Sequence, residues 1–136
     1  MKYYLVLIIS SLLIGCGNAQ DKVKNDLIGV WGNSEDGGKT FWGYDEYLPN
    51  GTLFAWGTLP GSHVSYNIEA SYNIKKEAAL MSCLTINKSS EPEFIPVGLY
   101  WCDEIVEVNS GIFKFKDEDG EVTTLYKQKN ITRPSI

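Results

Sequence analysis

The stretch VSYNIEASYNIK, residues 64–75, decides the fold class of this chain. Apolar and polar residues alternate without a break along it, so one face is apolar and the other polar. A period of two over this length is typical of a half-buried strand in an antiparallel sheet, because successive side chains of a strand point to opposite faces. The apolar positions are Val64, Tyr66, Ile68, Ala70, Tyr72 and Ile74.

Turn residues divide the chain on both sides of this stretch into further short strands. Pro49-Asn50-Gly51 and Asp117-Glu118-Asp119-Gly120 are typical of hairpin turns, since glycine supplies the positive φ that such turns need. Pro92 and Pro96 mark a longer polar loop. The expected strands are Ile28–Gly32, Phe41–Leu48, Thr52–Leu59, Val64–Lys75, Ala78–Asn87, Val97–Asn109, Ile112–Lys116 and Glu121–Gln128.

Eight sequentially connected antiparallel strands must protect two sheet edges from pairing with other chains. Closure into an up-and-down barrel removes both edges, and an eight-stranded barrel holds either a filled core or one small ligand. The sequence therefore predicts an all-β domain over residues 27–136, a small eight-stranded antiparallel up-and-down barrel. A flattened sandwich of the same strands is the alternative.

The N-terminal part of the chain has the organisation of a targeting segment. Lys2 precedes an apolar run over residues 3–14, which is shorter than the roughly 20 residues of a membrane span and matches the core of a signal peptide. The run ends in Leu13-Ile14-Gly15-Cys16, which resembles the lipobox of bacterial lipoproteins. The resemblance implies a signal peptide over residues 1–15, followed by a lipidated Cys16 and a polar tether over residues 16–26.

A lipidated cysteine implies anchoring by acyl chains such as palmitate, and two or three of them hold a protein to a bilayer where one does not. The resemblance implies an outer-membrane lipoprotein facing the periplasm if the organism is Gram-negative, because Gly17 rather than aspartate follows the cysteine. Otherwise it implies a lipid-anchored protein of the cell membrane. An ordinary cleaved secretory peptide, with Cys16 incidental, is the alternative.

The charge of the chain excludes one large class of partner. It carries 12 basic and 17 acidic residues, and loss of the predicted leader with Lys2 leaves a net charge of −6. The phosphates of nucleic acids require a basic surface, so we expect no nucleic-acid partner. The only histidine, His63, is a poor basis for a catalytic dyad or a metal site. We expect no cofactor, no metal and no enzymatic activity.

Two short motifs resemble those of lipocalins and lipocalin-like bacterial domains. Leu27-Ile28-Gly29-Val30-Trp31 resembles the Gly-x-Trp that begins their first strand, and the stretch from Tyr47 to Phe54 resembles the aromatic–turn–Gly-Thr hairpin of the small bacterial versions. The resemblance covers residues 27–128. It implies that Gly29 and Trp31 plug the closed end of the barrel, and that Lys127 packs over the tryptophan ring. It also implies a small hydrophobic ligand.

Cys83 and Cys102 lie in the two predicted strands that flank the loop around Pro92 and Pro96. Opposed residues of an antiparallel hairpin share a constant sum of residue numbers, and the sum of the two cysteines aligns three apolar pairs on the other face. Cysteines opposed in this way are close enough to bridge in an oxidising compartment. Two separately buried, reduced cysteines are the alternative. The aligned pairs are Leu84 with Trp101, Ile86 with Leu99, and Leu80 with Ile105.

Acidic residues cluster at Asp45-Glu46, at Asp103-Glu104 and in the turn Asp117–Glu121. Neighbouring strand residues point to opposite faces, so each pair contributes at most one inward carboxylate. The cysteine register places Asp103 opposite Ser82 on the largely apolar face, where it either serves the structure or contacts a ligand. The acidic turn lacks the glycine and glutamate spacing of an EF-hand loop, which favours a charged hairpin tip.

The aromatic residues include the candidate binding residues. Trp42, Tyr44, Trp56 and Tyr100 are candidates for the wall of a ligand cavity or for hot spots of a partner surface, and ordinary packing is the alternative for each. Asp103 is the candidate polar contact for a ligand.

Two functions remain open. The first is binding of a small hydrophobic or amphipathic ligand in a barrel cavity of about 300 Å³ or more. The alternative is an envelope lipoprotein that binds another protein, as an enzyme inhibitor or a toxin-immunity protein. It predicts an exposed aromatic patch with an acidic rim on the loops near Pro60 or Pro92.

Overall fold

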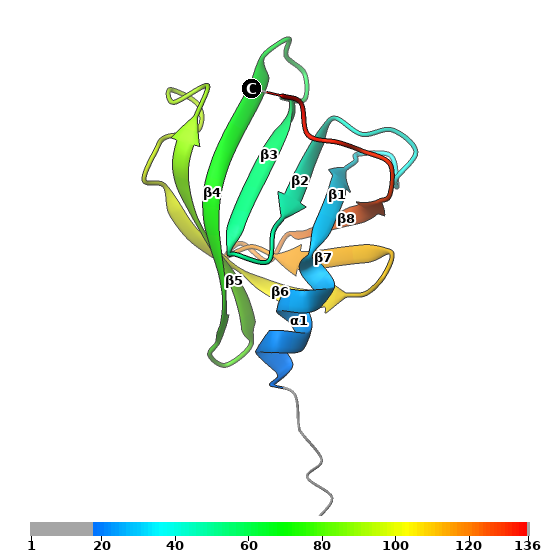
Figure 1. The fold of residues 1–136 in the computed structure, drawn as a ribbon, viewed down its shortest axis with the longest axis vertical. Coiled ribbons are helices and arrows are strands. Elements are labelled where there is room, and N and C mark those ends of the chain that lie inside the picture. Colours follow the sequence, from blue (N-terminus) through cyan, green and yellow to red (C-terminus); the bar gives the residue numbers. More distant parts are fainter. Residues whose placement is uncertain (1–17, 136) are drawn as a thin grey trace, which may run out of the picture.

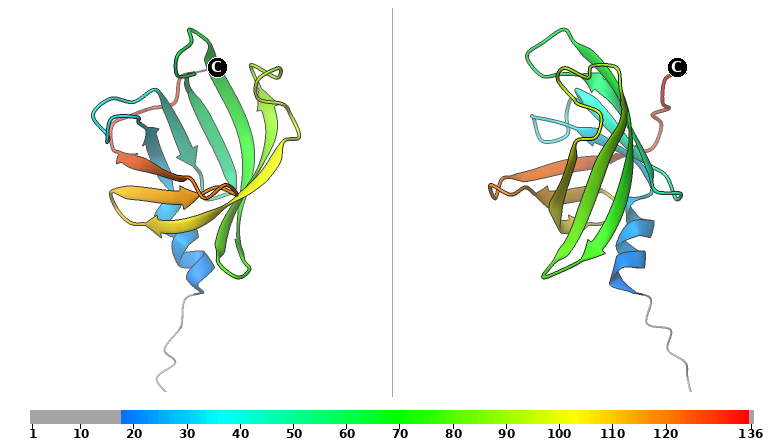
Figure 2. Two further views of the ribbon diagram at one scale, coloured as in Figure 1. Left: turned by 180° about the vertical axis from the view of Figure 1, so that it is seen from behind. Right: turned by 90° about the vertical axis from the view of Figure 1, so that its left-hand side faces the viewer.

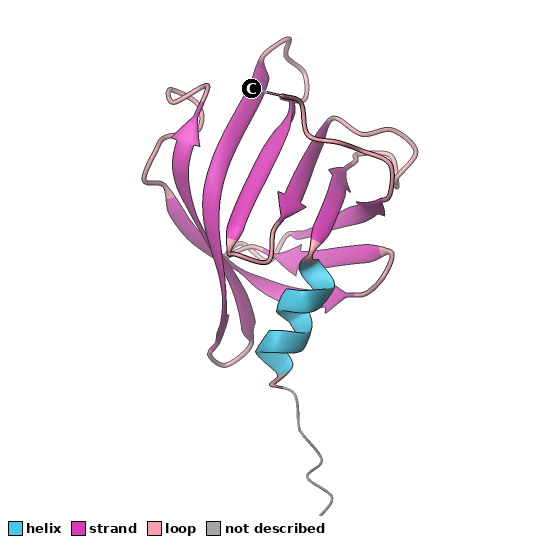
Figure 3. Ribbon diagram, viewed as in Figure 1, coloured by secondary structure: helices cyan, strands magenta, loops and turns pink. Residues whose placement is uncertain are grey.

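The computed structural model describes residues 18–135, which form a closed barrel of eight strands preceded by one helix (Figure 1, Figure 3). Each strand pairs antiparallel with the next, and β8 returns to pair with β1. The helix α1 spans Ala19–Leu27. The strands are β1 (Gly29–Asn33), β2 (Gly43–Tyr47), β3 (Thr52–Thr58), β4 (Ser65–Lys76), β5 (Leu80–Ser89), β6 (Tyr100–Val108), β7 (Ile112–Lys116) and β8 (Val122–Gln128).

The predicted eight-stranded barrel is confirmed, and the sandwich alternative is wrong because β1 and β8 are hydrogen-bonded neighbours. The alternating stretch forms β4, the longest strand, and each of its ends lies one residue later than predicted. Its apolar face is buried inside the barrel, which is why the alternation is so regular. The buried residues of this face are Tyr66, Ile68, Ala70, Tyr72 and Ile74.

The helix α1 lies where the sequence predicted a polar tether, and that prediction is wrong from Ala19 onward. The side chain of Asn18 caps the first turn by accepting from the N–H of Gln20 at 3.1 Å. Val23 and Leu27 share the helix face that packs on the barrel. Figure 2 shows the β4–β5 hairpin beside the helix, where the Gln20 amide donates to a β4 carbonyl at 3.2 Å. A helix of nine residues is marginal alone, so it depends on this packing.

The predicted signal peptide, residues 1–15, and the predicted lipidation site, Cys16, lie outside the described residues. Within residues 18–135, no helical segment combines the length and the apolar character that a bilayer crossing requires.

Trp31 of β1 is fully buried beside the last residue of α1. Its indole N–H donates to the carbonyl of Leu27 at 2.8 Å, and its ring centroid lies 5.9 Å from that of Phe113. The Lys127 ammonium lies 4.4 Å from the centre of the indole, in the place that the lipocalin resemblance implies. Gly29 leaves room for this lysine: its φ is +123°, and a Cβ there would lie 2.6 Å from the lysine Nζ.

A disulfide joins Cys83 of β5 to Cys102 of β6, as the register predicted. Two of the three apolar pairs are also present, one in the ladder and one joined by a backbone hydrogen bond of 3.0 Å. The third is absent because the ladder ends one step before it. The pairs found are Leu84 with Trp101 and Ile86 with Leu99, and the absent pair is Leu80 with Ile105.

Candidate functional site

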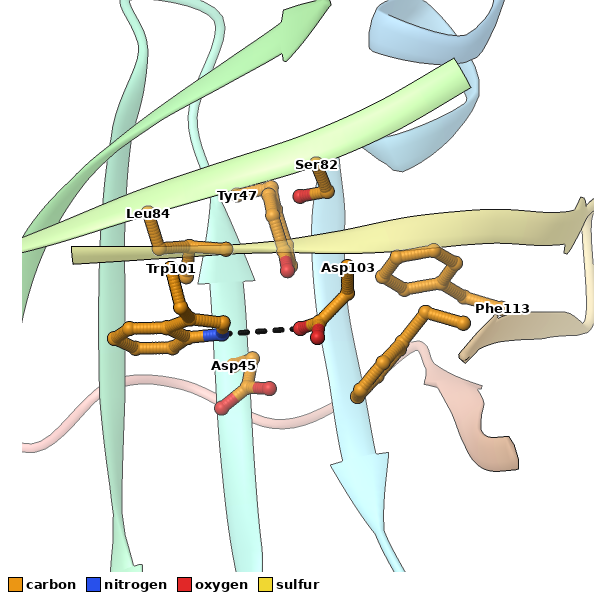
Figure 4. A pocket seen from close by; sticks show the side chains of 8 residues that line it. Asp45, Tyr47, Ser82, Leu84, Trp101, Asp103 and Phe113 are labelled. Carbon is orange, nitrogen blue, oxygen red and sulfur yellow. Dashed lines mark hydrogen bonds between the residues drawn. The ribbon is translucent and has the colours of Figure 1, made fainter. Parts of the chain in front are cut away.

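A cavity of about 190 Å³ lies inside the barrel, between β2 and the strands β5, β6 and β7. In the closed order of eight strands, β2 and β6 lie on opposite sides, so the cavity crosses the interior. Most of its wall is apolar, and its polar groups are two carboxyls, two hydroxyls and the indole N–H of Trp101 (Figure 4). The lining residues are Asp45, Tyr47, Ser82, Leu84, Trp101, Asp103, Phe113 and Phe115.

Two of the acidic clusters each contribute one carboxyl to this cavity. Asp45 of β2 and Asp103 of β6 both line it, and Figure 4 shows their carboxyl groups directed into the same space. Their chain neighbours Glu46 and Glu104 point outward and lie 3.5 Å and 2.8 Å from basic side chains. The alternation of strand faces therefore separates an inner pair of acids from an outer pair that has cationic partners.

Asp103 is 8% exposed and accepts a hydrogen bond of 3.0 Å from the indole N–H of Trp101. It pairs with Ser82 across the β5–β6 ladder, as the cysteine register predicted. Burial raises the pKa of Asp103, the bond from Trp101 opposes this, and the negative charges of Asp117 and Glu118 raise it further. Its surroundings therefore oppose ionisation unless a cation is near.

Asp45 has a similar environment on the opposite wall. Burial raises its pKa to about 6, and the side chain of Asn33 partly offsets this. Burial also raises the pKa of the neighbouring Tyr47 hydroxyl well above its ordinary value, and the charge of Asp45 adds to the rise. No lysine or arginine among residues 18–135 lines the cavity, so this wall offers no cation to either carboxylate.

Ser82 adds an unsatisfied hydroxyl to the cavity. Its side chain is 2% exposed, and its Oγ has no hydrogen-bond partner among the described residues. Leaving a buried polar group unpaired costs about 1–3 kcal/mol, so folded proteins rarely do it. The hydroxyl is thus free to bond to a polar group of a ligand or to water.

A groove beside the acidic β7–β8 turn adjoins the cavity. β7 ends opposite Glu104, so residues 100–103 of β6 pair only with β5. The groove next to these residues measures about 510 Å³ and shares Trp101 and Asp103 with the cavity. Its other wall is the turn Asp117–Asp119. The interior site therefore borders an acidic surface opening.

Three of the predicted aromatic residues lie outside the barrel rather than on the cavity wall. Tyr44 and Trp56 alternate with inward residues of β2 and β3, and their ring centroids are 5.8 Å apart on the outer face. Tyr100 is 54% exposed, and its hydroxyl accepts from Lys75 at 3.1 Å. The prediction of these three as cavity wall is wrong because each occupies the outward position of its strand.

Trp42 lies just before β2, with its ring 6.4 Å from that of Tyr66. It lines a separate rim pocket of about 280 Å³ formed with the start of β8. Of the five predicted contacts, only Asp103 lines the interior cavity. Sequence reasoning missed Asp45 and Trp101, although the cysteine register had already placed the tryptophan on the inner face.

The cavity is smaller than the predicted 300 Å³ or more. A protein cavity of about 150 Å³ binds benzene, so about 190 Å³ holds one ring with a short substituent. Aromatic side chains take the remaining interior volume. The ring centroid of Phe113 lies 6.1 Å from that of Tyr47, in an edge-to-face arrangement, and 5.4 Å from that of Phe115, in a tilted one.

The acidic turn after β7 is built as a hairpin tip. The Asp117 carboxylate accepts from the backbone N–H groups of Asp119 and Glu121 at 3.0 and 2.9 Å, which shapes the turn. In the part of the chain that the structure describes, no group of three or more His, Cys, Asp or Glu side chains is arranged to hold a metal ion.

Comparison with known proteins identifies the fold. No protein-family model matches the sequence, and no curated protein matches it. A lipocalin-like protein from Bacteroides uniformis ATCC 8492 superposes on 76% of this chain and 99% of its own, with 15% identity and a TM-score of 0.55. The chain has a lipocalin-like fold. The fold is also similar to that of an uncharacterized protein from Bacteroides eggerthii DSM 20697. The superposition covers 75% of the present chain and 99% of that protein's chain, with 14% identity and a TM-score of 0.51.

The raised pKa of Asp45 predicts a pH-dependent stability that Asp45→Asn removes. The folded state holds this proton more tightly than the unfolded state, whose pKa is near 3.8. The stabilisation is therefore complete below about pH 4 and is lost as the pH rises through about 6. The rise in the pKa from 3.8 to about 6 sets an upper limit of about 3 kcal/mol, and because Asp45 is partly accessible we expect about 1–2 kcal/mol.

Urea denaturation across this pH range measures the effect. At neutral pH, Asp45→Asn should be more stable than the wild type, and the difference should vanish at low pH. Glu46→Gln, the outward neighbour, should follow the wild-type profile. A difference in stability between Asp45→Asn and the wild type that does not change with pH would contradict the raised pKa of Asp45.

Proposed function

We propose that this protein binds a small amphipathic molecule inside its barrel, without catalysis. The observation that supports this most is the cavity, whose aromatic walls suit an apolar group and whose two carboxyls and free Ser82 hydroxyl suit a polar one. The closed eight-stranded barrel adds support, since its interior is wide enough for one small ligand.

A cavity-filling variant tests this function. Native mass spectrometry of the protein purified from its own membrane should show a bound small molecule. Leu84→Phe extends a ring into the cavity and should abolish that binding, whereas Thr85→Phe changes the adjacent outward position and should retain it. Wild-type protein without a bound molecule, or equal retention in both variants, would contradict the proposal.

The proposal includes a lipid anchor at Cys16. In a Gram-negative cell this anchor would hold the protein on the outer membrane, facing the periplasm, and in other bacteria it would hold the protein on the cell membrane. Its support is the tetrapeptide over residues 13–16, which resembles a lipobox. Because α1 begins at Ala19, an anchored Cys16 would keep the barrel close to the bilayer. Cells fed an alkyne analogue of palmitate should label the wild type but not Cys16→Ser, and equal labelling would contradict the anchor.

A protein partner is the second candidate, because the loop between β5 and β6, which contains Pro92, carries exposed apolar residues, one of them aromatic. Phe94 is 65% exposed, and Val97 and Leu99 are also exposed. Glu91 and Glu93 add charge to this loop. A pull-down from envelope extracts at low and moderate salt should recover a stoichiometric protein that Phe94→Ala loses. Recovery of no such protein would count against this function.

A further inference from the structure

The charge balance of the interior cavity is one-sided. Asp45 and Asp103 face it from opposite walls, and none of the described residues that line it is basic. Two lysines beside the groove already have partners: Lys75 donates to Tyr100 at 3.1 Å, and Lys116 lies 2.8 Å from Glu104. Two carboxyls enclosed in apolar walls require either protons or a cation, because an unpaired buried charge is costly.

A second observation points to a bound group rather than to a purely structural acid pair. Ser82 Oγ faces the same cavity, is almost fully buried and has no partner among the described residues. A serine hydroxyl accepts hydrogen bonds as well as donating them. Together with the two carboxyls it provides three acceptor groups around the cavity, and a primary ammonium group has three N–H donors.

The walls between these acceptors suit the rest of an organic cation. Tyr47, Trp101, Phe113 and Phe115 are all aromatic and line the same space. Aromatic faces attract ammonium groups by cation–π interaction and also pack against a hydrocarbon ring. A bare metal ion would gain nothing from such walls, since hard cations need six or more oxygen ligands.

The opening of the site carries the same sign of charge. The groove that adjoins the cavity is bordered by the acidic turn Asp117–Asp119. Clefts lined by one sign of charge raise the local concentration of the opposite sign and speed its association. Hydrogen bonds from backbone N–H groups to Asp117 shape this turn. Its negative charge also favours the approach of a cation.

We propose that the ligand of this cavity is a small organic ammonium ion, with one ring or a short chain, whose ammonium group lies between Asp45, Asp103 and Ser82. The inference rests on the proposed ligand-binding function and specifies its chemical class. The cavity of about 190 Å³ sets the size, because a protein cavity of about 150 Å³ already accommodates benzene.

Calorimetric titration with three ligands of one shape tests the charge. Benzylamine, benzyl alcohol and benzoate share a ring and differ in charge at neutral pH. We expect benzylamine to bind about tenfold or more tightly than benzyl alcohol, with benzoate the weakest. Asp45→Asn and Asp103→Asn should each lower the affinity for benzylamine about tenfold and change the affinity for benzyl alcohol by less than about twofold.

Glu104→Gln is the matched control, because it removes the same charge from the outward neighbour of Asp103 and should change neither affinity by more than about twofold. Ser82→Ala gives a second, structurally mild variant and should weaken benzylamine less than the aspartate variants do. Circular dichroism confirms that each variant is folded before titration.

Three results would overturn the inference. The first is benzyl alcohol or benzoate binding as tightly as benzylamine, and the second is benzylamine failing to bind. The third is calcium displacing benzylamine with the same dependence on both aspartates, which would assign the site to a metal ion. In each case the native mass spectrum of Leu84→Phe decides separately whether the cavity binds a small molecule at all.

Discussion

Replacing Trp31 with alanine is expected to lower the free energy of unfolding by about 3–5 kcal/mol. The side chain is fully buried, so its removal leaves a void beside Phe113. It also removes the donor to the Leu27 carbonyl and the ring beneath the Lys127 ammonium, so the carbonyl loses its hydrogen bond and the lysine loses a cation–π contact. Urea denaturation followed by circular dichroism measures the loss.

The control for this variant is another large aromatic truncation at an exposed site. Phe94→Ala should change the stability by no more than about 0.5 kcal/mol. The loss of stability in Trp31→Phe should lie between those of Phe94→Ala and Trp31→Ala, because phenylalanine restores a ring but not the N–H donor. A loss below about 1 kcal/mol for Trp31→Ala would show that the indole does not hold α1 against the barrel.

Removal of the disulfide is the second large effect. Replacing Cys83 and Cys102 with serine should cost about 3 kcal/mol, because the unfolded chain regains the freedom of a loop with a sequence separation of 19. The bond also has a local consequence for the site. Cys102 lies between Trp101 and Asp103, in the part of β6 that has no neighbour on its β7 side. Its loss should loosen the opening of the cavity.

Two measurements separate the global effect from the local one. Urea denaturation should show that a reductant lowers the free energy of unfolding of the wild type and leaves that of the double serine variant unchanged. Hydrogen exchange should become faster for the amides of residues 100–103 than expected from the global loss alone, with the amides of β4 as the internal reference. Equal stability of variant and wild type would contradict the role assigned to the disulfide.

The barrel was predictable from the sequence because its signals are local. The period-two pattern of β4 needs one buried face, and the hairpin turns fix which strands are neighbours. The register between β5 and β6 followed from matching apolar pairs, and it also placed Asp103 opposite Ser82. Strand pairing between sequence neighbours leaves few alternatives once the apolar faces are known.

The site was only half predictable because it depends on contacts across the barrel. Asp103 was found through the register of its own hairpin, but Asp45 lies on β2, where aromatic residues occupy both faces and the alternation is ambiguous. Nothing local shows that β2 and β6 face each other. That relation appears only when the sheet closes and three strands separate them on each side of the barrel.

The outer aromatic residues misled the sequence reasoning for a related reason. Tyr44 and Trp56 stack on the outside of β2 and β3, and Phe41 extends this cluster at 6.0 Å from Tyr44. The segment after β8 runs back along the outside of the barrel (Figure 1), and Arg133 lies 3.6 Å from the centre of the Phe54 ring. Aromatic content therefore reflects an outer layer of packing as well as a core, which composition does not distinguish.

The most direct test of the interior carboxyl pair is a carbon-13 NMR titration of the aspartate side chains, with and without benzylamine. Without ligand, Asp45 should titrate near pH 6 and Asp103 above the ordinary aspartate range. Saturating benzylamine should lower the apparent pKa of both carboxyls, because a nearby cation favours their charged forms. Ordinary titration of both groups, unchanged by benzylamine, would contradict a cation-binding site inside this barrel.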